Sequence, residues 1–341
     1  MNGTPPDVQV IRPFNQAIEL TKTILFRPFD LTKWFIIGFA AWLANLGGGG
    51  GMNVPTTNWR TSTRNNPAFD GLRDTIHQTS TATLIVGLVV LGILILGLII
   101  LFAWLRARGR LMFTDCVVRN RAAVKEPWRE FRSLGNSLFL FSLLVGLGFL
   151  ALTLILGLPF IAMVARGHHH PPNPLAIVMI VVWAGVVFIA GIAWALINHL
   201  MVPIMYRRRC RALDAFRAAI GVINANPGEI TIYCLFWILL FIATAIIGCV
   251  ATCLTCCVAA LPYIGTVILL PIFVCLRGFG LLFLRQFGPD YDVWFGLPET
   301  TAGVTDPGYN PASSVPPTAP PPPSPPEPPP VNPPEPPASS G

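Results

Sequence analysis

Four polar side chains inside or beside apolar runs are the strongest candidates for a chemical role in this sequence. Arg277 lies within such a run, Arg106 ends another, and Asn198 and His199 lie near the end of a third. A charge at membrane depth is costly and by default marks a functional site, although a long arginine side chain also extends to the interface. The four residues could together line a cytoplasm-facing pocket for an anion. Ordinary hydrogen bonding between helices is the favoured interpretation of the same residues.

Cysteine and histidine clusters are the second group. Cys249, Cys253, Cys256 and Cys257 fall close to one face of a helix, as a soft-metal site or a redox switch would require. The paired C-x-x-C spacing of structural zinc sites is absent, and small polarizable thiols pack well between apolar helices, so packing is favoured. The run "HHHPP" at 168–172 is interpreted as a polar turn. We therefore predict no metal and no cofactor.

The motifs of well-known enzyme classes are missing. The sequence contains no HExxH metalloprotease motif, no GxSxG nucleophile elbow and no phosphate-binding P-loop. Ser142 and His199 would act as an intramembrane dyad only beside an oxyanion site, and no glycine context supplies one. We expect a non-enzymatic protein without catalytic residues.

The composition places these residues in a membrane protein. Of 341 residues, 53% are hydrophobic and 11% are charged, whereas soluble domains carry about 25% charged residues. The N-terminal sequence lacks a basic stretch followed by an apolar one, so no cleavable signal peptide is expected. A spanning helix needs about 20 mostly apolar residues. Six segments qualify, the short first one marginally, and predict an all-α, polytopic fold: 33–48, 83–105, 137–165, 175–202, 230–257 and 262–284.

Positive charge is concentrated in alternate segments between the spans. The segments 106–132 and 207–217 are rich in arginine, and the intervening loops are poorer in it. Basic loops stay in the cytoplasm, so both termini are expected there, and a bacterial inner membrane is the expected location. The same segments predict contact with anionic lipid headgroups and no nucleic-acid partner. Pro127 and Trp128 suit a short amphipathic helix, which is interpreted as part of an ordinary loop in preference to a headgroup sensor.

Short internal matches predict that the six spans form three copies of one helical hairpin. "RPFDLTKWF" at 27–35 resembles "NPGEITIYC" at 226–234, and "LRARGRLMF" at 105–113 resembles "LRGFGLLFL" at 276–284. Each copy would consist of a cytoplasmic amphipathic helix, a span out, a loop and a span back. In this repeat Arg106 corresponds to Arg277 of the last span. Because Arg106 lies at the end of its span, the correspondence favours a role of Arg277 at the interface.

Three regions follow from these patterns. Residues 1–32 are expected to form a cytoplasmic segment with an interfacial helix, 33–298 the membrane domain, and 299–341 a proline-rich cytoplasmic tail. The tail cannot build a core and is expected to be disordered, in extended polyproline II conformation. Its PxxP patterns suit a protein partner with an aromatic-lined groove, although a semi-rigid spacer or a plain disordered end is the favoured interpretation.

A family resemblance rests on the segments "RPFDLTKW", "RGRLMFTDCVVRNR" and "EPWREFRSLGNSLF". Over about residues 12–295 the sequence resembles a family of uncharacterised bacterial multi-pass membrane proteins. It is also distantly similar to the membrane domain joined to some glycerophosphodiester phosphodiesterases. The resemblance implies a membrane domain alone, because the soluble barrel with its metal-binding carboxylates has no counterpart in this sequence.

The function expected from these observations is that of a non-enzymatic integral membrane protein that interacts with lipid or serves as a scaffold. The alternative is a small-molecule or lipid transporter with a cytoplasm-facing pocket for anions near Arg277. Pro271, Gly278 and Gly280 are expected to break the last span, and broken helices are common at the binding sites of transporters.

Overall fold

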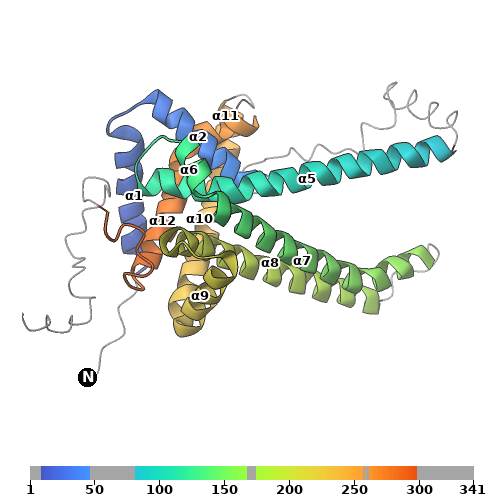
Figure 1. The fold of residues 1–341 in the computed structure, drawn as a ribbon. Helices are drawn as coiled ribbons and strands as arrows, with labels where there is room; N and C mark the ends of the chain where they lie inside the picture. Colours follow the sequence, from blue (N-terminus) through green and yellow to red (C-terminus); the bar gives the residue numbers. More distant parts are fainter. Residues whose placement is uncertain (1–8, 47–80, 167–173, 256–257, 259–260, 298–341) are drawn as a thin grey trace, which may run out of the picture. The chain divides into compact units, whose positions relative to one another are not determined.

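The computed structural model describes residues 9–46, 81–166, 174–255, 258 and 261–297, which all belong to one unit of the chain. This described part is helical and contains no strand, in agreement with the all-α prediction. Its helices follow the chain in this order (Figure 1): α1 (Ile11–Phe26), α2 (Leu31–Asn45), α5 (Thr81–Val118), α6 (Lys125–Glu130), α7 (Arg132–Arg166), α8 (Pro174–Arg208), α9 (Ala212–Ala225), α10 (Pro227–Leu254), α11 (Pro262–Ile268) and α12 (Leu270–Arg285).

Within the described residues, four helices are long and apolar enough to cross a membrane, so the chain is a membrane protein. The first and the last of the six predicted spans differ from these four. Helix α2 has 15 residues and is about 22 Å long, whereas the hydrocarbon core of a bilayer is about 30 Å thick. The last predicted span is divided into α11 and α12. The four long segments are Ala82–Val118, Arg132–Ile155, Val178–Arg208 and Pro227–Leu254.

The break between α11 and α12 has a clear cause in the sequence. Pro271 lies in the first turn of α12, and a proline has no backbone N–H and clashes with the carbonyl group four residues earlier. That carbonyl belongs to Val267, and it accepts a hydrogen bond from the indole nitrogen of Trp34 at 2.9 Å. Helix α2 comes this close because it carries Gly38, where a Cβ would lie 2.9 Å from Val267 Cγ2. The break is therefore stabilised by α2.

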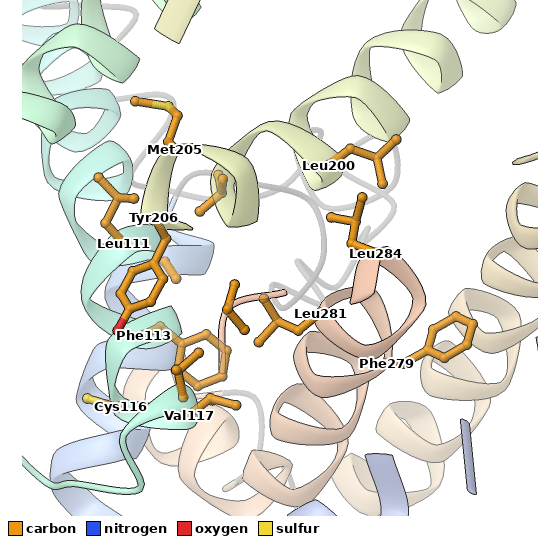
Figure 2. Close-up of a cluster of buried hydrophobic side chains, with 14 of the residues drawn as sticks. Leu111, Phe113, Cys116, Val117, Leu200, Met205, Tyr206, Phe279, Leu281 and Leu284 are labelled. Atoms are coloured by element: carbon orange, nitrogen blue, oxygen red, sulfur yellow. The ribbon is translucent and has the colours of Figure 1, made fainter. Parts of the chain in front are cut away.

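The buried core is formed by the C-terminal parts of α5 and α8 and by most of α12. Leu111 of α5 and Leu200 of α8 are fully buried, and Figure 2 shows Leu200 facing Leu284 of α12. The preceding part of α5 behaves differently, since its large apolar side chains, such as Leu88 at 75% exposure, lie on the surface. Lipid contact requires such an apolar surface.

The N-terminal amphipathic helix turns its apolar side toward the protein. Ala17, Leu20 and Ile24 of α1 are buried, and α1 packs against α12. In the same way α9 packs against α8, and α6 and α7 pack against α5. Helices α5 and α8 therefore pack against helices that follow them in the chain, and α12 packs against the N-terminal helix α1. These contacts bring the C-terminal parts of α5, α8 and α12 together, since the three also contact one another.

Candidate anion-binding site at the junction of three helices

Hydrogen bonds between polar side chains join α5, α8 and α12 where these helices meet. Arg110 Nη1 donates to Asn198 Oδ1 at 2.8 Å. Arg277 Nε donates to Thr114 Oγ1 at 3.0 Å, and Arg277 Nη2 donates to the carbonyl oxygen of Arg110 at 3.4 Å. The hydroxyl of Thr114 donates to the same carbonyl at 2.7 Å. Two guanidinium groups from different helices are thus held around one turn of α5.

His199 extends this group of polar residues to α10. Its Nδ1 lies 3.0 Å from the hydroxyl oxygen of Tyr233, with which it shares a hydrogen bond, and its ring packs edge-on against Trp237. A Cβ at position 280 would lie 2.3 Å from His199 Cε1, so Gly280 leaves the space that the imidazole occupies. Figure 2 shows buried apolar side chains of α5, α8 and α12, such as Leu111, Leu200 and Leu281. We call the following residues the junction cluster: Arg110, Thr114, Asn198, His199, Tyr233 and Arg277.

The prediction that Gly278 and Gly280 break the last span is wrong. Helix α12 is continuous through both glycines, and the break lies earlier, between Ile268 and Leu270. The physical reason is that both glycines face neighbouring helices closely. A Cβ on Gly278 would lie 3.1 Å from a methyl carbon of Leu20, and Gly280 faces the imidazole described above. Close packing outweighs the modest helix-destabilising effect of glycine.

Arg110 and Arg277 have no carboxylate partner among the described residues. Both side chains are half-buried, and Arg110 also experiences the positive charges of Arg106 and Arg277. Burying like charges together without a counter-ion is unfavourable. The arrangement therefore favours an anion beside the two guanidinium groups, which present paired N–H donors that match the oxygens of phosphate and carboxylate.

Three of the four candidate residues proposed from the sequence lie in the junction cluster: Arg277, Asn198 and His199. Arg106 adds its charge, and its buried Nε has no hydrogen-bond partner within the described part of the chain. Arg110 was missed, although its position four residues after Arg106 on one helix face was a usable signal. Thr114 and Tyr233 were missed as well, and no local pattern in the sequence marks them.

A second group of charges at the end of α5 is neutralised within the protein. The fully buried Asp115 accepts hydrogen bonds from the Tyr206 hydroxyl at 2.9 Å and from Arg121 at 2.9 and 3.0 Å. Arg119 Nε lies 3.2 Å from the same carboxylate. On the outer side of this group, Arg209 pairs with Glu130 at 2.6 Å. These arginines have acidic partners, in contrast to those of the junction cluster.

The aromatic side chains of the loop between α5 and α7 pack inside the protein. Phe131 is buried beside Tyr206, with ring centroids 5.4 Å apart. Arg108 lies over the rings of Trp104 and Trp128, at 4.1 and 5.1 Å from its guanidinium carbon. The half-buried Trp128 contacts Trp104 and Arg108 of α5, and these contacts hold the loop against that helix. This geometry favours the interpretation of the segment as a structural loop.

The described residues contain no group of three histidine, cysteine or acidic side chains that could hold a metal ion. Cys249 and Cys253 are exposed and free. Cys256, Cys257 and the histidine run lie outside the described residues. Cys210, between α8 and α9, is half-buried. Burial raises the pKa of its thiol, which disfavours the reactive thiolate.

Comparison with known proteins identifies a family for this chain and names no activity. Neither the curated proteins nor the solved structures gave a match. The expected similarity to the phosphodiesterase membrane domain stays a prediction. Residues 8–293, well over half of the chain, match the sequence model described as "Family of unknown function (DUF7544)". The chain therefore belongs to this family of unknown function.

Proposed function

We propose that this chain is a non-enzymatic integral membrane protein that binds the anionic headgroup of a lipid at the junction cluster. One observation carries the proposal: the Arg277 guanidinium donates to Thr114 and to the backbone carbonyl of Arg110, and neither Arg277 nor Arg110 has a carboxylate partner among the described residues. Two half-buried guanidinium groups beside a polar Asn198 can hold one phosphate through several charge-assisted hydrogen bonds. A scaffolding role of the proline-rich tail remains part of the proposal, and the tail lies outside the described residues.

The proposed topology has six crossings with both termini in the cytoplasm of a bacterial inner membrane. Helix α2 would be a short crossing, and α11 with α12 a broken one. Residues 262–285 would extend about 36 Å as helix, enough for the hydrocarbon core. The basic segments 106–132 and 207–217 support this orientation. The junction cluster would then lie near the cytoplasmic leaflet, where anionic lipids are concentrated.

The proposed three hairpins are α1–α2–α5, α6–α7–α8 and α9–α10–α12. The returning helix of each hairpin packs against the beginning of the next: α5 against α6 and α7, α8 against α9, and α12 against α1. This cyclic order is what three repeats around a common axis would produce. It also supplies a reason for the position of the junction cluster, because the returning helices contribute Arg110, His199 and Arg277 near that axis.

Native mass spectrometry of the gently extracted protein tests the lipid proposal. Wild type should retain an anionic phospholipid, and Arg277→Ala should lose about 10- to 150-fold in affinity, since hydrogen bonds to charged groups contribute about 1.5–3 kcal/mol. Arg217→Ala is the matched control, because Arg217 is an exposed arginine of α9. Equal retention by the two variants would contradict the proposal.

A second candidate function is transport of an anionic lipid or small molecule. The break between α11 and α12 supports it, because discontinuous helices border the binding sites of many transporters. Reconstituted vesicles would show movement of a fluorescent anionic lipid between leaflets. Movement that depends on Arg277 would favour transport, whereas binding without movement would favour the first function.

A further inference from the structure

A small apolar cavity lies beside the junction cluster, between α8 and α10. Its volume is about 60 Å³. Both helices are long and apolar enough to cross a membrane. The lining includes the exposed Ala195 and the half-buried Trp237, so the cavity opens onto a surface that faces lipid. The lining residues are Ile192, Ala195, Leu196, His199, Tyr233, Cys234, Trp237 and Ile238.

Two members of the junction cluster, His199 and Tyr233, belong to the cavity lining, whereas Arg110 and Arg277 do not. His199 and Tyr233 are hydrogen-bonded to each other, and the charges of Arg277 and Arg110 act on the imidazole ring. An apolar cavity next to a positively charged cluster is complementary to a molecule with an anionic head and an apolar chain. A small soluble anion would bind only the arginines and would leave the apolar cavity empty.

We infer that this cavity receives a segment of one acyl chain of an anionic phospholipid whose headgroup lies at the junction cluster. The inference rests on the proposed function and names its ligand as a lipid in place of a free phosphate. A volume of about 60 Å³ equals about two water molecules in the liquid, so only a short part of the chain enters. The remainder lies along exposed apolar side chains of α10, such as Leu235 and Leu239.

Photolabelling of the full-length protein in phosphatidylcholine vesicles tests this inference. The probe is phosphatidylglycerol with a diazirine on one acyl chain, and the same chain on phosphatidylcholine is the control probe. Mass spectrometry of the labelled peptides should place the phosphatidylglycerol label on Ala195, Leu196 and Trp237 at least five-fold above the control probe. Arg277→Ala should reduce this excess to the level of the control probe.

Filling the cavity should separate chain binding from headgroup binding. Ala195→Trp should abolish the label inside the cavity and should leave the preference for phosphatidylglycerol over phosphatidylcholine in place. Ala193→Trp is the matched control, because Ala193 is an exposed alanine of α8 outside the cavity lining.

Two results would overturn the inference, and they are distinguishable. If wild type prefers phosphatidylglycerol but the label falls evenly over exposed positions such as Leu235 and Leu239, the headgroup site stands and the chain site is wrong. If neither probe is preferred in wild type, the proposed function fails as well. Wild-type labelling alone decides between these results, so a folding defect of a variant does not obscure the answer.

Discussion

Replacement of Gly280 by alanine tests whether His199 is held in place as the structure shows. The new Cβ would lie 2.3 Å from Cε1 and 3.0 Å from Nδ1 of the imidazole, so His199 must move and lose its hydrogen bond to Tyr233. Tyr233 is fully buried. An unsatisfied buried hydroxyl costs about 1–3 kcal/mol, and overpacking costs about 1–3 kcal/mol. The helix gain of alanine over glycine returns about 1 kcal/mol, which leaves a net destabilisation of about 1–5 kcal/mol.

Gly278→Ala is the matched control for this experiment, two residues earlier in the same helix. Its Cβ would meet a terminal methyl carbon of Leu20 at 3.1 Å, which a flexible side chain can relieve, so its stability should stay within about 1 kcal/mol of wild type. The assay is reversible unfolding in mixed detergent micelles. In a His199→Ala background, Gly280→Ala should become nearly neutral, because interacting residues show coupling energies. If Gly280→Ala is as stable as Gly278→Ala, the reasoning about the imidazole is refuted.

Three further predictions concern the fold and its orientation. Trp34→Phe removes the indole donor at the helix break and should destabilise the protein by about 1–3 kcal/mol in the same unfolding assay; an unchanged stability would mean that the break needs no donor. Asp115→Asn should cost about 1.5–3 kcal/mol because it removes the charge that the fully buried carboxylate shares with Tyr206, Arg119 and Arg121, whereas Asp290→Asn, on a carboxylate that is 80% exposed, should cost under about 1 kcal/mol; equal effects would speak against the buried network. Reporter fusions after Lys125 should read as cytoplasmic and those after His169 as external, and the reverse result would overturn the proposed topology.

The membrane-spanning helices could be predicted from the sequence because their lengths and apolar character are local properties. The break near Pro271 was also predictable, since a proline disrupts a helix wherever the helix lies. The bounds predicted for the first span, 33–48, were shifted, because α2 begins at Leu31 and ends at Asn45, before the glycine run. The predictions of the four long apolar helices and of the break near Pro271 agree with the structure, whereas the predicted helix boundaries are less accurate.

The junction cluster could be predicted only in part, because it depends on contacts between distant helices. Arg277, Asn198 and His199 stood out as polar residues in apolar runs. Tyr233 did not stand out, since an aromatic residue near the start of a span is common at membrane interfaces, and only the packing of α10 beside His199 gives it a partner. Gly280 was interpreted as a helix breaker because the residue that it contacts, His199, is 81 positions away in the sequence. Only the packing of α8 against α12 shows why a glycine is needed there.

The most direct test of the central claim is the affinity of the purified protein for phosphatidylglycerol when both junction arginines are removed. Wild type and an Arg110→Ala/Arg277→Ala double variant would be titrated in nanodiscs, with the Arg217→Ala variant as control. The account predicts at least a tenfold loss for the double variant, equivalent to about 1.4 kcal/mol, and no loss for the control. Equal affinity of all three proteins would contradict a lipid headgroup site at the junction cluster.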